Sequence, residues 1–223
     1  MQTSFIHLRV SSEFSISRGL LRINEIIENA QKLNMPAVAL SDLNNMFGMV
    51  KFFKKAEAAG IKPIAGTILN LRSRSGELGE VLCLAKNNDG LKSLMGIISQ
   101  SQLQQENGYI SITFEDLSSC VGNIMVISGG SASTIFNLAK LKKNQDLKTE
   151  LSSFKETFKD DFCIELQRLG KSFEEEFIQC ILPLASELQI PIIATNDTMF
   201  SKKEDFDIHE TKVCINTGKT LND

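Results

Sequence analysis

Apolar residues follow two patterns along the chain: short continuous runs, and longer stretches with an apolar residue at every third or fourth position. The short runs predict β-strands and the longer stretches predict amphipathic α-helices. Seven runs fit strands: 5–10, 36–41, 62–71, 80–85, 123–128, 161–166 and 191–195. Six stretches fit helices: 22–33, 47–59, 89–103, 132–141, 145–157 and 172–188. The alternation of strands and helices predicts an α/β fold.

The strand runs favour a mainly parallel sheet that is covered by helices. The segments AVAL, IMVI and PIIA are apolar at every position, which is typical of strands buried on both faces. Polar residues follow many of the strands, as at 11–13, 41–42, 128–130 and 196–197. A closed barrel builds its site at this carboxyl edge, and so does the crevice of an open doubly wound sheet. We favour the barrel.

Composition and charge narrow the class of protein. A chain of 223 residues that is 42% hydrophobic suits one domain with a well-buried core, so we expect a single domain over residues 1–223. The net charge of −3 argues against a stand-alone DNA-binding domain. Five scattered cysteines, with no Cys-x-x-Cys, are typical of reduced thiols. Without a secretion signal or a membrane span, the chain is predicted to be cytoplasmic.

Four local segments allow a functional and a structural interpretation. The sequence SGGSAS (128–133) could hold an anion on backbone amides, but a tight turn with Ser131 as helix cap is favoured. Residues 73–80 fit a hairpin loop, and the lysines of 140–148 fit a solvated helix face more than a contact site. Glu165 is expected to point into the interior at a strand end, where a carboxylate often binds an arginine.

Asp42, Asp207 and His209 are the best remaining candidates for metal or catalytic chemistry. An aspartate after a strand usually caps the next helix, and a lone histidine on a helix is more often a hydrogen-bonded structural residue. These three residues alone therefore identify no activity.

Longer segments resemble a known family, in order from one end of the chain to the other. They are FIHLRVSSEFS (5–15), PAVALSDLNNMFGMVKFFKKAEAAGIKPIAG (36–66), LAKNNDGLKSLMGIIS (84–99), IELQRLGK (164–171), PIIATND (191–197) and DIHETKVCINTGKTLND (207–223). Together they resemble the polymerase-and-histidinol-phosphatase (PHP) domain at the N-terminus of bacterial replicative DNA polymerase III alpha subunits. The resemblance implies a distorted (βα)7 TIM-like barrel. In metal-containing relatives, His and Asp or Glu ligands bind zinc or manganese there and support phosphoesterase or proofreading exonuclease activity.

The resemblance also implies that ligands are missing from this chain. The family's first motif, His-Leu-His-Val-His-Ser, falls on residues 7–12, so two metal-binding histidines are replaced by Arg9 and Ser11, while His7 matches a non-ligand histidine. The second motif, an acid followed by histidine, becomes Asp42 and Leu43.

Further positions of the family pattern are altered or kept. An expected carboxylate is Ile68, an acid found in many relatives is Arg18, and a histidine found two residues after the Asn-Asp pair is Met199. The closing Asp-x-His motif maps intact to Asp207 and His209.

We therefore predict a vestigial pocket without a metal or a catalytic residue. Its members are Arg9, Ser11, Arg18, Asp42, Leu43, Ile68, Asp207 and His209. A guanidinium about 4 Å from a unit positive charge repels it by roughly 4 kcal/mol at an effective dielectric constant of about 20, and a divalent ion by about twice that. We expect the guanidinium to pair with Asp207 or Asp42 instead. The alternative is a residual zinc or manganese site of Asp42, Asp207 and His209 with phosphoesterase or 3'-5' exonuclease activity.

The resemblance implies a place in DNA replication. The chain would be one domain of a much longer polymerase, whose catalytic carboxylates lie beyond residue 223. Its implied partners are a separate proofreading exonuclease subunit, which docks on this domain, and the remainder of the polymerase alpha chain. DNA would be bound by the full-length protein, and no membrane is involved.

Overall fold

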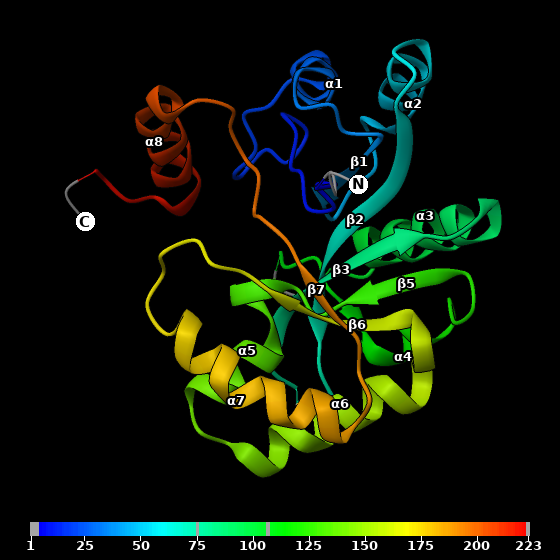
Figure 1. The fold of residues 1–223 in the computed structure, drawn as a ribbon, viewed down its shortest axis with the longest axis vertical. Helices are drawn as coiled ribbons and strands as arrows, with labels where there is room; N and C mark the ends of the chain where they lie inside the picture. Colours follow the sequence, from blue (N-terminus) through cyan, green and yellow to red (C-terminus); the bar gives the residue numbers. More distant parts are fainter. Residues whose placement is uncertain (1–4, 75, 106–107, 222–223) are drawn as a thin grey trace. The chain divides into compact units, whose positions relative to one another are not determined.

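The computed structural model describes residues 5–74, 76–105 and 108–221 (Figure 1). Contacts within the chain divide it into two compact units. Unit 1 comprises residues 1–65 and 197–223, and unit 2 comprises residues 66–196.

Unit 1 is built on short elements, of which the periodicity predicts a part. Its elements are α1 (Ile23–Lys32), β1 (Ala37–Leu43), α2 (Met49–Ala58), the start of β2 (Lys62–Arg72), a 3-10 turn (Lys203–Asp205) and α8 (Phe206–Thr217). Helix α1 buries Ile23, Ile26, Ile27 and Ala30 on one face, at the spacing that predicted it. It packs against β1 and α2. Helix α8 was not predicted, and no residue of it is buried.

The strand predicted over residues 5–10 is absent, because the side chain of Ser41 takes the place of a backbone acceptor. The segment is extended, and Ala39 N donates to His7 O at 2.9 Å. Val10 N donates to Ser41 Oγ at 2.8 Å, where a regular ladder would use a backbone carbonyl. Only isolated bridges remain, from Val10 to Thr198 and from Ser12 to Leu21.

Unit 2 holds most of the sheet and five helices. Its strands are the rest of β2, then β3 (Leu78–Ala85), β4 (Ile112–Thr113), β5 (Ile124–Ile127), β6 (Phe162–Leu166) and β7 (Ile192–Ala194). Its helices are α3 (Asn88–Leu103), α4 (Phe114–Ser118), α5 (Thr134–Lys140), α6 (Asn144–Phe158) and α7 (Glu174–Glu187). The strand order is β2-β3-β5-β6-β7, with β4 beside β2. Helices α6 and α7 both pack on α5, and α3 packs on β3 (Figure 1).

The prediction of a mainly parallel sheet is correct for only part of unit 2. Strands β5, β6 and β7 pair in parallel, but β3 is antiparallel to both β2 and β5. A short connection forces this reversal, because a parallel partner would need a longer crossover. That connection lies within residues 73–80, which confirms the predicted hairpin loop. The short β4 and α4 were missed because elements of two and five residues carry almost no periodicity.

The glycine-rich segment forms the predicted turn, with a different cap. Gly129 and Gly130 have φ of 91° and 62°, a conformation that favours glycine. A Cβ at Gly129 would lie 2.0 Å from Glu80 O, so this position also requires a missing side chain. The cap of α5 is Ser133, which accepts a hydrogen bond from Phe136 N, and not Ser131 as predicted.

Aromatic side chains form the centre of unit 2. The rings of Phe114 and Phe162 lie 5.1 and 4.8 Å from that of Phe154, and Phe158 lies 6.2 Å from it. All four are buried. The five cysteines are free thiols, three of them buried. The lysines of 140–148 lie on an exposed face, where Lys143 pairs with Glu77 at 2.8 Å.

Candidate functional site

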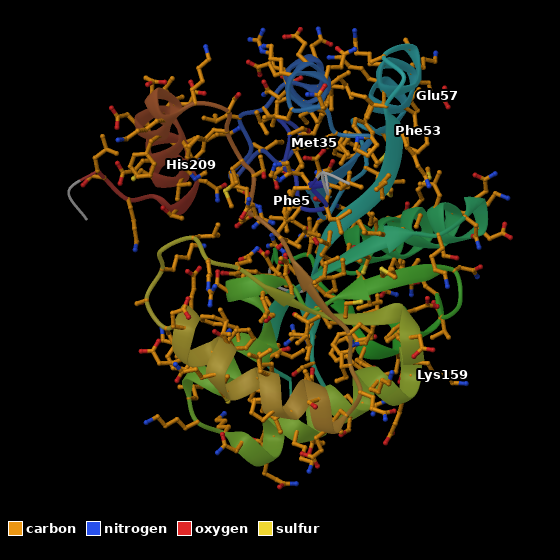
Figure 2. All side chains as sticks on the ribbon, viewed as in Figure 1. Phe5, Met35, Phe53, Glu57, Lys159 and His209 are labelled. Atoms are coloured by element: carbon orange, nitrogen blue, oxygen red, sulfur yellow. The ribbon has the colours of Figure 1, made fainter. Side chains whose placement is uncertain are left out.

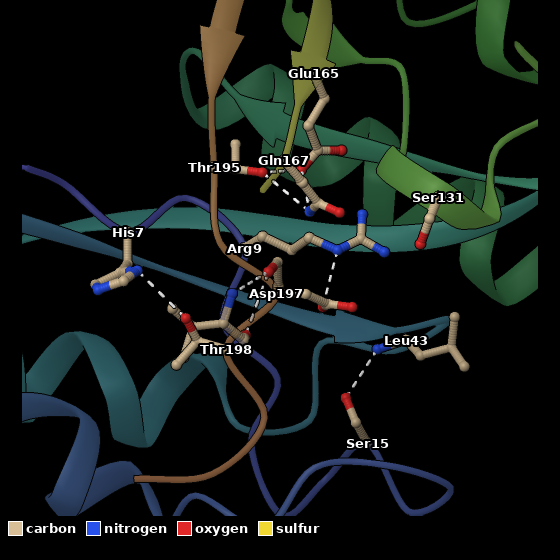
Figure 3. A network of polar contacts seen from close by, with 12 residues as sticks. His7, Arg9, Ser15, Leu43, Ser131, Glu165, Gln167, Thr195, Asp197 and Thr198 are labelled. Atoms are coloured by element: carbon tan, nitrogen blue, oxygen red, sulfur yellow. Dashed lines mark hydrogen bonds and ion pairs between the residues drawn. The ribbon is translucent and has the colours of Figure 1, made fainter. Parts of the chain in front are cut away.

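A buried ion pair stands in unit 1 where the resemblance places a metal ligand. Arg9 is 2% exposed, and its Nε lies 3.0 Å from Asp197 Oδ1 (Figure 3). The two segments are also joined through their backbones. Thr198 N donates to Arg9 O at 3.1 Å, and Ser11 N donates to Thr198 O at 2.9 Å. The guanidinium is thus held by its own backbone as well as by the carboxylate.

Asp42, at the end of β1, is held by hydroxyl and amide donors. Its carboxylate accepts hydrogen bonds from Ser12 N at 2.7 Å, Ser12 Oγ at 2.8 Å and Ser15 Oγ at 2.7 Å. Burial raises the pKa of Asp42, and the serine hydrogen bonds and the Arg18 charge oppose that rise. Three donors fill acceptor positions on this carboxylate that a metal ion would otherwise use.

Helix α8 is tied to the loop before α1 by two side chains. His209 Nδ1 lies 2.9 Å from Arg18 O, and Lys212 Nζ donates to Gly19 O at 2.5 Å. His209 is half-buried on α8, as labelled in Figure 2, whereas Asp207 is exposed. The Asp-x-His motif therefore supplies a structural histidine and a surface aspartate.

The remaining predicted positions carry no metal-ligand set. Leu43 is half-buried, and its N–H donates to Ser15 Oγ at 3.0 Å. Ser11 is buried, and its Oγ has no hydrogen-bond partner among the described residues. Ile68 is fully buried on β2 in unit 2. In the part of the chain that the structure describes, no three His, Cys, Asp or Glu side chains gather so as to hold a metal ion.

His7 has a structural position, as predicted. Its Nδ1 lies 3.2 Å from Thr198 Oγ1, and its ring meets that of Phe5 edge-on at 5.0 Å. Burial lowers the pKa of His7, because the charged imidazolium is the form that loses hydration.

The sequence reasoning missed the acid that matters most here. It expected a guanidinium to pair with Asp207 or Asp42. In the structure Arg9 pairs with Asp197, and the charge of Arg18 acts on Asp42. A signal was present, because Asn196 and Asp197 directly follow the predicted strand 191–195, at the edge where polar residues gather. The intact Asp-x-His pattern drew attention to Asp207, which is exposed on the surface of α8.

Unit 2 has a buried polar cluster of its own. Glu165 is 1% exposed on β6, which confirms its predicted interior position. Its Oε1 accepts hydrogen bonds from Thr195 Oγ1 and from Gln167 Nε2, the latter at 3.2 Å (Figure 3). No helix in the described residues is long and apolar enough to span a membrane.

Comparison with known proteins finds a PHP domain in the chain and a similarity to DNA polymerase III alpha subunits. The family profile described as PHP domain matches residues 7–169. The chain is 38% identical to DNA polymerase III subunit alpha of Pseudomonas aeruginosa, over its full length. It is 35% identical to the subunit of the same name from Escherichia coli K12, over 98% of the chain. The chain spans 19% of the length of each of these relatives.

Solved structures of low sequence identity share the fold. A putative metal-dependent phosphoesterase from Bifidobacterium adolescentis matches with a TM-score of 0.61 at 10% identity, over 93% of this chain and 96% of that one. An amidohydrolase from Chromobacterium violaceum matches with a TM-score of 0.60 at 12% identity, over the same shares. These likenesses concern the fold alone, and they confirm the predicted α/β class.

Proposed function

Because the chain belongs to the PHP domain family, we propose that it is the PHP domain of a DNA polymerase III alpha subunit, acting as a structural module without hydrolytic activity. The observation that carries this proposal is the buried ion pair between Arg9 and Asp197. In this interpretation Arg9, Ser11, Arg18, Asp42, Leu43, Ile68, Asp207 and His209 are remnants of a metal site.

The electrostatics of Arg9 support the loss of metal. A guanidinium is always charged, and it offers fixed donors that match a carboxylate. At 3.0 Å from Asp197 it supplies the positive charge that a metal ion would have supplied to that acid. A divalent ion at about 4 Å from the guanidinium would be repelled by roughly 8 kcal/mol at an effective dielectric constant of about 20.

The surroundings of Asp42 support the same conclusion. Ser12 and Ser15 donate three hydrogen bonds to this carboxylate, and Ser12 is fully buried. A zinc site needs about four ligands and a hydrolytic two-metal site needs bridging carboxylates. The residues present do not fit that set, so no catalytic step is derived through a metal.

The partners of the module follow from its place in the polymerase. Relatives without the metal site rely on a separate proofreading exonuclease subunit. We propose that such a subunit docks on this domain in the cytoplasm. The domain would also support the remainder of the alpha chain, and DNA would be bound by the full-length protein.

Metal-dependent hydrolysis tests the loss of activity. The chain is incubated with manganese or zinc and assayed on a chromogenic phosphoester and on single-stranded DNA, and no turnover above buffer is expected. Turnover that disappears in both Asp42→Asn and His209→Ala would establish the alternative, a residual phosphoesterase or 3'-5' exonuclease.

Restoring ligands gives a sharper test. The triple variant Arg9→His, Ser11→His, Leu43→His returns three imidazoles to the positions where the family carries them. Calorimetry should then detect binding of manganese that is tighter than any binding by the unmodified chain. The matched control Arg22→His, Ser99→His, Leu141→His adds three imidazoles at exposed positions and should gain no comparable affinity. Equal binding by both triple variants would contradict the proposed site.

Docking is tested independently of hydrolysis. The purified chain is titrated with a purified proofreading exonuclease subunit from a bacterium whose polymerase alpha subunit is a close relative. Saturable binding is expected. If neither the purified chain nor the full-length alpha subunit binds the exonuclease subunit, the proposed docking role is refuted. The family membership of the chain would be unchanged.

A further inference from the structure

Glu174 in unit 2 is a buried carboxylate. Among the described residues, one of its oxygens is hydrogen-bonded and the other is not. It is the first residue of α7 and is 6% exposed. Its Oε2 accepts three backbone N–H donors, from Leu169, Gly170 and Lys171, at 2.8, 3.0 and 3.1 Å. These amides fix the orientation of the carboxylate at the N-terminus of the helix. Its Oε1, also buried, has no hydrogen-bond partner among the described residues.

A small cavity lies against this carboxylate. Its volume is about 10 Å³, and Glu165, Gln167 and Ser131 line it together with Glu174. A space of this size holds one water molecule or one ion. The remaining walls are Gly130 and two phenylalanine rings.

The polar groups around the cavity are mostly oxygen acceptors. Gln167 donates its Nε2 to both Glu165 and Thr195, and its Oε1 faces Gly130, since a Cβ there would lie 2.7 Å from that oxygen (Figure 3). Ser131 Oγ accepts from Lys171 Nζ at 3.2 Å. Lys171 itself is exposed.

From this arrangement we propose that the cavity binds one hard metal cation of the Mg²⁺ or Ca²⁺ class. Glu174 Oε1 is its anchoring ligand, and Glu165, Gln167 and Ser131 supply further oxygens. An all-oxygen set selects such cations over zinc. A water molecule would give Glu174 Oε1 a donor, but it would add no positive charge beside this buried carboxylate.

The proposed site differs from the family's metal site in residues and in role. It uses none of the residues in the vestigial pocket, and it has only two carboxylates. So few charged ligands predict a weak affinity, on the order of 10⁻⁴ to 10⁻³ M. The role of the cation is to tie the N-terminus of α7 to the end of β6.

Thermal unfolding of the whole 223-residue chain tests the site. The protein is treated with a chelator and its Tm is then measured with Mg²⁺ or Ca²⁺ up to about ten times the expected dissociation constant, at constant ionic strength. A rise of several degrees is expected. Glu174→Gln should abolish this rise, because the amide removes the charge that anchors the cation. Glu175→Gln, at the exposed neighbour, should keep it.

A crystal of the unmodified chain soaked in Mn²⁺ provides a second measurement that needs no variant. An anomalous peak beside Glu174 Oε1 is expected. A Tm that does not respond to either cation, a response unchanged in Glu174→Gln, or a water molecule alone in the cavity would each overturn the inference. A response that is lost in His209→Ala but kept in Glu174→Gln would refute this inference and also contradict the metal-free pocket. A response lost only in Glu174→Gln leaves the proposed function intact.

Discussion

The interiors of the two units are stabilised by different kinds of interaction. In unit 1 the buried groups include a guanidinium, an aspartate and several serines, joined by hydrogen bonds of 2.7 to 3.0 Å. In unit 2 the centre is a cluster of phenylalanine rings with centroids 4.8 to 6.2 Å apart. Interactions between charges need exact partners, whereas apolar packing needs only shape and volume. Unit 1 should therefore respond to pH and to the loss of single partners, and unit 2 to the loss of volume.

The largest effect is expected from a cavity in unit 2. Phe154→Ala removes a ring that contacts Phe114 and Phe162 and should lower the free energy of unfolding by about 3–5 kcal/mol. Urea unfolding followed by circular dichroism measures this. Phe47→Ala, at a residue that is 73% exposed, is the matched control and should change stability by less than about 0.5 kcal/mol. A small loss in Phe154→Ala would show that the aromatic cluster does not dominate unit 2.

Breaking the ion pair of unit 1 should have the next largest effect. Asp197→Leu leaves the buried Arg9 without this carboxylate and should lower the free energy of unfolding by about 3 kcal/mol. The double variant Arg9→Met, Asp197→Leu removes both charges and should recover most of that loss. A double variant as unstable as the sum of the single variants would mean that the two residues act independently.

Ser15→Ala should produce a smaller loss that depends on pH. Ser15 Oγ donates to Asp42 and accepts from Leu43 N, so its removal should lower stability by about 2 kcal/mol at neutral pH. The folded-state pKa of Asp42 lies above its ordinary value of 3.8, so the burial of this carboxylate opposes folding as the pH rises through 3.8. Losing a donor raises that pKa further. The difference between variant and unmodified chain should therefore shrink as the pH falls through the folded-state pKa of Asp42, which lies above 3.8, and a constant difference would argue against this role.

The smallest effect is expected from His7. Its pKa in the folded state is lowered below 6.5, so the unfolded chain binds the proton more readily. This contribution to stability is present above pH 6.5 and is lost as the pH falls through the folded-state pKa. His7→Gln should have a flatter stability profile between about pH 5 and 7, measured by thermal unfolding. An identical profile in both proteins would assign the acid sensitivity to other groups.

Hydrogen exchange would compare the units directly. If unit 1 depends on its polar network, Asp197→Leu should speed amide exchange in β1 and α1 more than in β5 and β6. Equal acceleration throughout would show that the two units unfold as one.

The periodicity of apolar residues was sufficient to predict regular helices and strands. It was insufficient to predict how the strands pair. The spacing of Ile23, Ile26 and Ile27 predicted α1, and the apolar run at 124–127 predicted β5. The periodicity did not reveal that residues 5–10 form no regular β-ladder. The hydroxyl of Ser41, which replaces a backbone acceptor for Val10 N, lies 31 residues away in the sequence. The periodicity also did not reveal the antiparallel β3, since strand direction leaves no mark on a single apolar run.

What the sequence determined by itself was chemistry: the arginine and serine at expected ligand positions, the buried glutamate of β6, and the family to which the chain belongs. Only the tertiary structure decided which side chains pair with one another. Asp197 is separated from Arg9 by 188 positions, and folding alone brings their side chains to 3.0 Å. A charge can be read from one residue, but an ion pair depends on the distance between two, and that distance exists only after the chain has folded.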